Sequence, residues 1–214
     1  MKLPVATLAL SIVTLAAAPA FAATDVTLSF EGATSFASVA DFYSGGTDGA
    51  GASGTDFGLS FSGAALALKN DELGPYFSGA PSPDTVMFGA GDSAVVLNAP
   101  LGIIDKVTFF YATETDALSS VKVYSGLDGS GSLLASIAIG NAQIGCTAAP
   151  YCRFDFTTAK FDGVARSVSF GSNPAVAFDD ISVTTVPEAS TTAMLFAGLG
   201  VVGLLARRRR HSQA

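Results

Sequence analysis

The sequence predicts an all-β protein, an antiparallel β-sandwich of jelly-roll type, flanked by an apolar segment at each end. Three observations predict this fold. Short runs within residues 23–185 alternate apolar and polar side chains, as half-buried strands do. Turn-forming pairs such as Gly45-Gly46 and Asp128-Gly129 separate these runs. No stretch of ten or more residues between 23 and 185 has the 3.6-residue period of an amphipathic helix.

About ten strands are expected, each rich in Val, Ile, Phe, Tyr and Thr. In chain order they cover residues 26–30, 57–61, 85–89, 94–97, 106–112, 119–124, 133–139, 153–157, 165–170 and 175–184. Two longer segments, 44–56 and 70–84, are predicted as loops because Gly, Ser, Asp and Pro are frequent in them. With sixteen Phe and no Trp in the chain, we expect phenylalanine to fill the space between the sheets.

Residues 1–22 have the three parts of a secretory signal peptide. Lys2 supplies the positive start, residues 3–18 are almost wholly apolar, and Ala20 and Ala22 form a small-x-small cleavage pattern. We therefore predict cleavage after Ala22 and export of residues 23–185, where disulfides persist. An uncleaved N-terminal anchor is the alternative.

The C-terminal segment predicts a single transmembrane helix over residues 191–206. Fourteen uncharged residues, 193–206, precede Arg207, Arg208, Arg209 and Arg210. The helix is about 24 Å long at 1.5 Å per residue, which is short for a hydrocarbon core of about 30 Å. Arginine side chains can extend to the headgroups and favour the cytoplasmic side. A length of this kind is also typical of a buried core helix, but four consecutive arginines oppose that interpretation.

A short polar motif precedes this helix. It consists of Val186, Pro187, Glu188, Ala189 and Ser190. The order of motif, Gly-rich apolar helix and arginine cluster over residues 186–210 resembles the PEP-CTERM sorting signal of Gram-negative bacteria, with Ala189 where the family has its second proline. The resemblance implies processing near Pro187-Glu188 by an exosortase, a membrane-embedded transpeptidase-like cysteine enzyme. It also implies transient tethering to the inner membrane, delivery to the cell surface or extracellular matrix, and an association with exopolysaccharide and biofilm. A single-pass membrane protein that keeps its tail is the alternative.

The charge distribution excludes nucleic acid as a partner. Lys2 and Arg207–Arg210 are five of the eleven basic residues, so residues 23–206 carry six basic and eighteen acidic side chains, a net charge of −12. Such a surface repels phosphate backbones.

The composition also argues against an enzyme. The single histidine, His211, lies in the tail, which excludes Ser-His-Asp, Cys-His and histidine-zinc chemistry in residues 23–185. A glycosidase is the alternative, since it needs only two carboxylates. The candidates, which no spacing pairs, are Glu31, Asp41, Glu72, Glu114, Asp155, Asp179 and Asp180.

Three further groups of residues are candidates for structural or binding roles. Cys146 and Cys152 have the spacing of a local disulfide in an exported protein. Glu31 ends the first strand, and Asp179 and Asp180 lie in the last. First and last strands of a jelly roll often lie side by side, so these carboxylates could bind a structural calcium ion, the alternative being an ordinary polar strand end. Residues 178–183, Phe-Asp-Asp-Ile-Ser-Val, resemble the final strand of carbohydrate-binding-like sandwiches in exported proteins, where a structural calcium is sometimes held.

Aromatic side chains in or near loops are the candidates for sugar binding, since sugars stack on exposed aromatic faces. These residues are Tyr43, Tyr76, Phe77 and Tyr151. Taken together, the sequence predicts an exported, non-enzymatic surface or matrix protein that an exosortase-like system sorts and that contacts extracellular polysaccharide.

Overall fold

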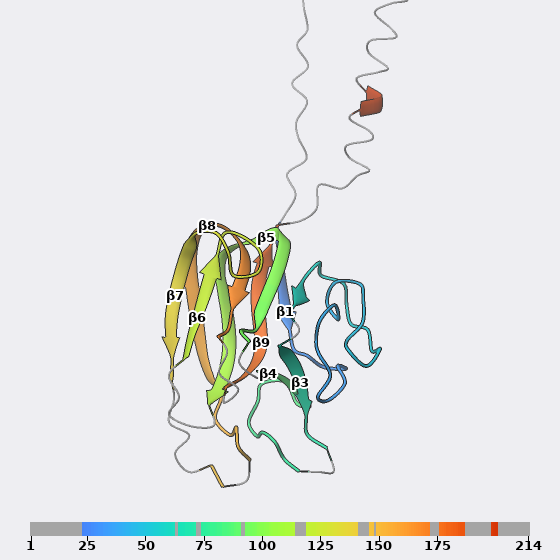
Figure 1. The fold of residues 1–214 in the computed structure, drawn as a ribbon, viewed down its shortest axis with the longest axis vertical. Helices are drawn as coiled ribbons and strands as arrows, with labels where there is room; N and C mark the ends of the chain where they lie inside the picture. The colour runs from blue at the N-terminus through green and yellow to red at the C-terminus, as the bar shows by residue number, and fades with distance from the viewer. Residues whose placement is uncertain are drawn as a thin grey trace, which may run out of the picture. The chain divides into compact units, whose positions relative to one another are not determined.

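The computed structural model describes residues 23–62, 64–71, 74–90, 93–113, 119–140, 146–147, 149–171, 176–186 and 198–200. The chain divides into two compact units: residues 22–188, called the body below, and a unit that joins residues 1–21 with 189–214. All the named strands belong to the body (Figure 1). In the other unit only residues 198–200 are described, and they are helical.

The body is built from nine antiparallel strands in its described residues, which confirms the all-β prediction. They are β1 (Thr24–Leu28), β2 (Ser60–Phe61), β3 (Ala65–Lys69), β4 (Thr85–Gly89), β5 (Val96–Thr113), β6 (Ser119–Tyr124), β7 (Leu133–Ile139), β8 (Asp155–Ser169) and β9 (Val176–Thr185). The order across the sheet is β3-β4-β9-β5-β8-β6-β7, with β1 also paired to β9 and β2 to β5. The pairing of β1 with β9 confirms that the first and last strands are neighbours.

Two long strands fold over and thereby make a sandwich of this sheet. The first residues of β5 pair with β2 and with the end of β8, whereas the part of β5 from Ile103 onward pairs with β9 and the start of β8. Gly102 lies at the bend with a φ of 109°, and a Cβ atom there would collide with Val164, so glycine is required. The sequence predicted two strands, 94–97 and 106–112, where the structure has β5 alone, and two strands, 153–157 and 165–170, where it has β8 alone. Both predictions of separate strands were wrong.

Two other strand predictions differ from the structure. β3 was not predicted, because its alternating residues Ala65 and Ala67 are small; they are nevertheless fully buried in the core. Only the last two residues of the predicted strand 57–61 pair with another strand. The N–H groups of Phe57 and Leu59 bind the carbonyl of Tyr43 instead, so tertiary contacts replace strand pairing here.

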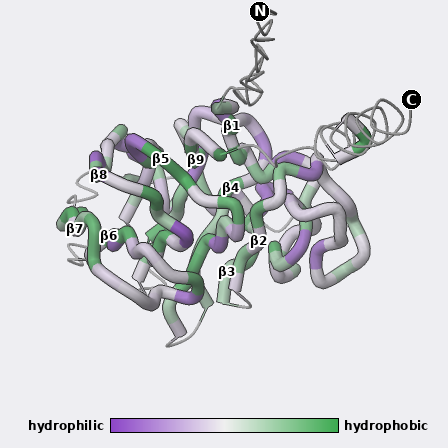
Figure 2. Tube along the Cα trace, turned by 90° about the horizontal axis from the view of Figure 1, so that it is seen from above, coloured by the Kyte–Doolittle hydropathy of each residue, from purple (hydrophilic) through white to green (hydrophobic). Residues whose placement is uncertain are grey.

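Phenylalanine fills the space between the layers, as predicted. Phe109, Phe170 and Phe178 are buried and meet edge to face, with ring centroids 4.9–5.7 Å apart. Hydrophobic and hydrophilic segments alternate along the strands in Figure 2. One main cluster of buried side chains therefore unites residues from β1 to β9.

A single carboxylate organises the 44–56 loop. Asp48 is buried, and its oxygens accept N–H bonds from Thr34 at 2.7 Å and from Ala50 and Ala52 at 2.9 Å. Burial by itself raises the pKa of Asp48, but these backbone donors outweigh it and hold the pKa below its usual value. The Gly-rich segment is thus fixed around a buried charge.

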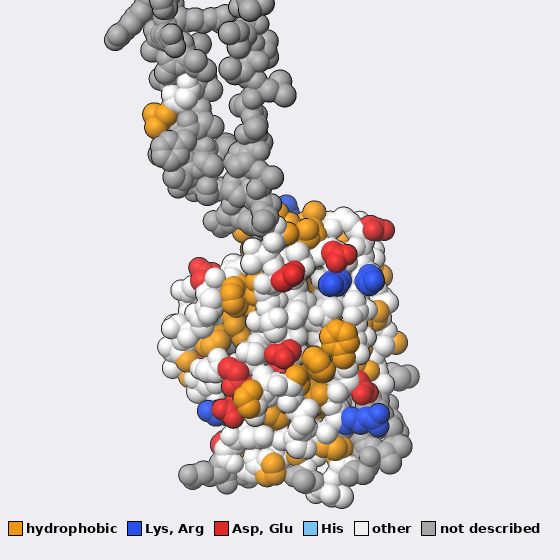
Figure 3. All heavy atoms as spheres, turned by 180° about the vertical axis from the view of Figure 1, so that it is seen from behind, with side chains coloured by type: hydrophobic (Ala, Val, Ile, Leu, Met, Phe, Trp, Pro, Cys, Tyr) orange, Lys and Arg blue, Asp and Glu red, His pale blue; other side chains and the backbone are white. Residues whose placement is uncertain are grey.

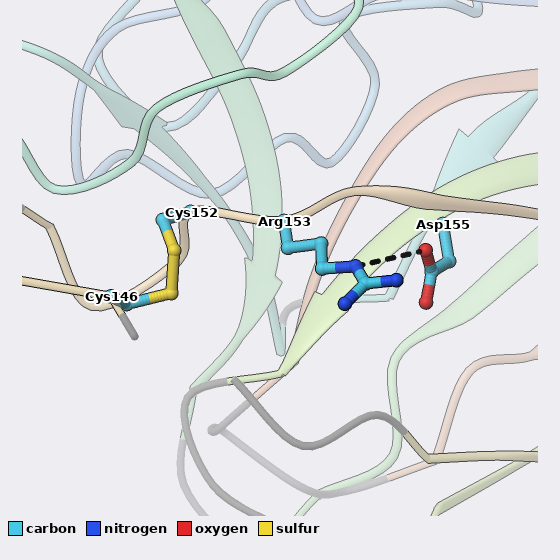
Figure 4. The surroundings of a disulfide bond; sticks show 4 residues. All are labelled: Cys146, Cys152, Arg153 and Asp155. Carbon is cyan, nitrogen blue, oxygen red and sulfur yellow. Dashed lines mark ion pairs between the residues drawn. A yellow bond between two sulfur atoms is a disulfide. The ribbon is translucent and has the colours of Figure 1, made fainter. Parts of the chain in front are cut away.

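The 70–84 loop folds back over the outer face of the sheet and covers a second, smaller apolar cluster. This cluster includes Phe77 from the loop and Tyr151 from the segment after Cys146. Ser78 donates its N–H to the Tyr151 carbonyl at 2.8 Å. The predicted disulfide Cys146–Cys152 is present, with the two Cα atoms 5.7 Å apart, and Arg153 pairs with Asp155 beside it (Figure 4).

Replacement of both cysteines by serine should lower the free energy of unfolding by about 2 kcal/mol, since the bond closes a loop of six residues and restricts the unfolded chain. Chemical denaturation of the wild type and of the double variant measures this difference. Reducing agent should shift the wild type to the variant's stability and leave the variant unchanged. Equal stability of the oxidised wild type and the variant would contradict the prediction.

No helix within the described residues is long and apolar enough to cross a membrane. The predicted signal peptide, with Ala20 and Ala22, lies outside the described residues. So do the predicted transmembrane helix, apart from residues 198–200, and Arg207–Arg210.

Candidate functional site

Pairing of the first and last strands brings the predicted carboxylates together. Leu28 pairs with Ile181, so Glu31 follows β1 at the level where Asp179 and Asp180 occur in β9. Burial, and secondarily the negative charge of Glu31, raises the pKa of Asp180. Burial is also the main reason that the pKa of Asp179 rises to about 7, with the charge of Asp180 adding to it. The three acids therefore form one electrostatic cluster.

Asp179 is fully buried and joins the last strand to the 70–84 loop. Its Oδ2 accepts the Ser82 N–H at 3.0 Å, its Oδ1 accepts the Asp180 N–H at 2.8 Å, and the Ser82 Oγ lies 2.7 Å from both carboxylate oxygens. The same Oγ lies 3.1 Å from the Ser29 carbonyl and 3.3 Å from that of Thr85. A hydroxyl has one proton to donate. Protonated Asp179 can donate to the Ser82 Oγ, which then donates to a carbonyl, so the neutral form satisfies more of the buried acceptors.

The backbone around this cluster is strained. Phe30 and Asp180 have φ angles of 62° and 45°, in the left-handed region that non-glycine residues rarely adopt. The Phe30 N–H donates to the Tyr43 hydroxyl at 2.7 Å, and burial raises the pKa of Tyr43 far above its usual range. Tyr43, a predicted sugar ligand, is thus a buried acceptor that holds this backbone in place.

The acid cluster has the chemistry of a hard-cation site but not a closed set of ligands. In the part of the chain that is described, no Lys or Arg forms an ion pair with Glu31, Asp179 or Asp180. Within the same residues, no group of three or more Asp, Glu, His or Cys side chains is arranged to hold a metal. Glu31 Oε1 accepts N–H bonds from Asp84 at 3.0 Å and Thr85 at 2.9 Å. Calcium binding here stays a prediction, with the half-buried pair Glu31 and Asp180 as its most accessible carboxylates.

Three of the four predicted sugar-binding aromatics lie in the interior. Tyr43, Phe77 and Tyr151 are 5%, 2% and 6% exposed, so their ring faces are covered by protein. The segments that carry these three residues pack against the hydrophobic clusters of the body. Tyr76 alone is half-buried and reaches the surface.

Tyr76 belongs to a surface cluster, called the edge cluster below, that also contains Phe36 and Phe88. The Phe36 ring stands edge to face with Tyr76 at 5.5 Å and with Phe88 at 6.2 Å. Phe36 is 51% exposed and has a φ of 59°, an unusual conformation for so large a side chain. Asn70 Oδ1 accepts a hydrogen bond from the Tyr76 N–H at 2.8 Å. Phe36 was not predicted from the sequence, because none of its neighbours along the chain indicates a left-handed backbone.

A second pair of aromatic rings, one exposed and one half-buried, lies on the outer face of β5 and β8. Phe110 and Phe156 are register partners with ring centroids 5.1 Å apart, and Phe156 is 59% exposed. A row of hydroxyl side chains crosses four strands beside them. It consists of Thr27, Ser182, Thr108 and Thr158, which follow one another through strand register.

Both aromatic groups face outward from the same layer of the sandwich. Phe88 on β4 and Phe156 on β8 are three strand spacings apart, about 14 Å. On the face drawn in Figure 3, hydrophobic side chains are interspersed with uncharged polar ones, while charged side chains stand in small groups. Such a surface suits an uncharged, extended, hydroxyl-rich ligand.

A pocket of about 340 Å³ lies where the body's two ends meet. Its lining includes Thr24, Thr185 and Val186 from these ends, together with Asp56 and Phe57. Asp56 is the only acidic residue that lines it, whereas glycoside hydrolysis uses two carboxylates. Asp56 was not among the carboxylates predicted for a glycosidase, and none of the predicted ones is in this lining. Of the predicted carboxylates, Asp155 pairs with Arg153, Asp179 is buried, and Glu72 and Glu114 lie outside the described residues.

Comparison with known proteins identifies the C-terminal motif. Residues 185–210 match the family model of the PEP-CTERM protein-sorting motif. The predicted motif residues Pro187 to Ser190 themselves lie outside the described residues. No curated protein matches the chain.

Solved structures support the fold. The K2 cleaved adhesin domain of Lys-gingipain aligns with a TM-score of 0.51 and 15% identity, over 76% of this chain and all of that domain. The K1 cleaved adhesin domain of Lys-gingipain from Porphyromonas gingivalis W83 aligns with a TM-score of 0.48 and 13% identity, over 77% of this chain and 99% of that domain. A family 29 carbohydrate-binding module from Piromyces equi aligns with a TM-score of 0.39 and 14% identity, over 79% of this chain and 95% of the module. At 15% identity, the alignment with the K2 domain shows a shared fold.

Proposed function

We propose that this chain, which carries a PEP-CTERM sorting motif at residues 185–210, is a non-enzymatic protein of the cell surface or extracellular matrix whose body contacts extracellular polysaccharide. The motif is the observation that carries the proposal. It supports export, recognition by an exosortase-type enzyme and transient association with the inner membrane. The polysaccharide contact is supported by the outer face of the sandwich.

All the strand pairings that the structure describes lie within residues 24–185. Thr24 pairs with Thr185, so two paired residues follow the predicted cleavage point after Ala22 and precede the one near Pro187 in the sequence. Val186, the first residue of the predicted motif, donates its N–H to the Gly102 carbonyl at 3.0 Å, and the described part of the body ends there. Removal of both segments therefore breaks no strand pairing that the structure describes, as processing of a folded cargo requires.

The outer face offers what a neutral polysaccharide needs. Phe36, Tyr76 and Phe156 expose apolar ring surface, and the hydroxyl row beside Phe156 supplies donors and acceptors for sugar hydroxyls. The Lys-gingipain domain of the same fold is described as an adhesin domain, which agrees with a role in attachment.

The polysaccharide contact predicts that Phe36→Ala and Phe156→Ala each weaken retention of the body on the producing cell's own exopolysaccharide about fivefold, since a stacked ring contributes about 1 kcal/mol. Affinity electrophoresis with the polymer in the gel measures the retention. Leu133→Ala is the matched control, because Leu133 is 55% exposed on β7, away from the outer face, and should bind like the wild type. Equal retention of all four proteins would contradict the proposed binding face.

Calcium is proposed as a structural ion at Glu31 and Asp180. Addition of about 1 mM Ca²⁺ to the chelator-treated body should raise its thermal unfolding midpoint, because a cation relieves the repulsion between these carboxylates. Asp180→Asn should abolish most of this rise, and Asp162→Asn, a change at an exposed acid on β8, should not. An unchanged midpoint in the wild type, or the same rise with Mg²⁺, would contradict a calcium site.

A further inference from the structure

β7 forms an exposed edge of the sheet. Its only strand neighbour among the described residues is β6. Its sequence, Leu-Leu-Ala-Ser-Ile-Ala-Ile, contains no charge and no proline, although charges, prolines and covering segments are the usual protection of an edge strand. The opposite edge, β3, is covered: Phe36 and Val39 donate N–H bonds to the carbonyls of Ala67 and Ala65.

Apolar side chains of β7 are incompletely buried. Ala135 and Ile137 pack against the main core but remain half-exposed, and Leu133 is 55% exposed. Figure 2 shows β7 at the rim of the body, hydrophobic over most of its length. Another strand laid against β7 would bind its unpaired backbone groups and cover these side chains.

Of the contacts that two copies could make, charge favours one through β7. Residues 23–206 carry a net charge of −12, so two copies repel each other at most of the surfaces through which they could meet. β7 is uncharged, and the nearest charge on β6 is Lys122, which pairs with Ser136. In a contact between two β7 strands the two lysines are three strand spacings apart, about 14 Å, beyond the screening length of about 8 Å. Antiparallel pairing of identical strands also closes as a twofold dimer.

We propose that β7 pairs antiparallel with β7 of a second copy and joins the two sandwiches through one continuous sheet. A contact through one short strand is smaller than a stable interface, so it requires the high local concentration that surface display provides, and in this respect it rests on the proposed function. The Leu133 end of β7 lies at the same end of the body as the start of β1 and the end of β9 (Figure 1). The twofold axis of the dimer therefore places the ends of the two β9 strands on opposite sides of the pair. The pairing thus joins molecules on facing surfaces.

Sedimentation of the body, residues 23–186, over concentrations up to about 1 mM tests the pairing. The wild type should shift from monomer to dimer mass as concentration rises. Ser136→Lys and Ser136→Glu should each remain monomeric, because like charges then face each other, and an equal mixture of the two should dimerise again. Ser78→Lys, a matched change in the 70–84 loop, should dimerise like the wild type.

A wild type that is monomeric throughout, as it would be if β7 paired only with a different protein, would overturn the proposal. Dimers of Ser136→Lys as strong as those of the wild type would also overturn it. Thermal unfolding checks that the Ser136 variants are folded. Because Ser136 lies away from the outer face, Ser136→Lys should retain polysaccharide binding, so failure of the pairing and failure of the proposed function are distinguishable.

Discussion

In calcium-free buffer, the contribution of Asp179 to the free energy of unfolding of the body should fall as the pH rises from about 4 to about 7. Burial raises the pKa of Asp179 from 3.8 to about 7 in the folded state. Below pH 4 both folded and unfolded chains hold the proton. Between the two values the unfolded chain releases it while the folded chain retains it, so ionisation favours unfolding. The loss across this range is at most about 4 kcal/mol.

Other acids also titrate in this range. The difference in free energy of unfolding between the wild type and Asp179→Asn, followed against pH, therefore isolates the contribution of Asp179. Asparagine keeps an acceptor for the Ser82 N–H and a donor for the Ser82 Oγ and carries no charge, but it loses the acceptor for the Asp180 N–H, a cost that does not change with pH. Urea denaturation at several pH values should show the variant gaining stability relative to the wild type as the pH rises. Asp162→Asn is the control and should follow the wild type. A constant difference between wild type and Asp179→Asn from pH 4 to 8 would contradict the raised pKa.

Replacement of both Pro187 and Glu188 by alanine should abolish sorting. Pro187 has no N–H and restricts its preceding residue to extended conformations, which presents the motif as a strand-like substrate. We expect the double variant to accumulate in the membrane fraction with Arg207–Arg210 still attached, and the surface fraction to lose most of the protein. Fractionation followed by immunoblotting measures both pools.

Two further variants sharpen this test. Ala189→Pro creates the Pro-Glu-Pro tripeptide of the family and should be processed at least as well as the wild type. Replacement of the four arginines by serine should let the chain pass through the membrane, since the basic cluster is what favours retention on the cytoplasmic side. Normal surface delivery of the Pro187, Glu188 double variant would show that the motif is not the signal.

The sequence predicted most of the strands because their inward side chains alternate. β4, β6 and β7 begin and end at the predicted residues. Cys146 and Cys152 could be paired from spacing and compartment, and the proximity of Glu31 to Asp179 followed from the expected neighbourhood of first and last strands. These features depend on local pattern or on one topological rule.

The remaining features depend on contacts between distant parts of the chain. Phe77 and Tyr151 appeared to be exposed because they lie outside strands, but the two segments that carry them pack together over the sheet. The bends of β5 and β8 depend on the approach of Gly102 to Val164, which no local pattern indicates. The edge cluster requires a left-handed Phe36, held by the Ala67 carbonyl from another strand.

Intact mass spectrometry of the mature, surface-associated protein tests the processing at both ends most directly. The predicted result is a chain that begins at Ala23, ends near Pro187-Glu188 and lacks Arg207–Arg210, together with any group joined to its new C-terminus. A mature protein that retains Lys2 or the arginine cluster would contradict it.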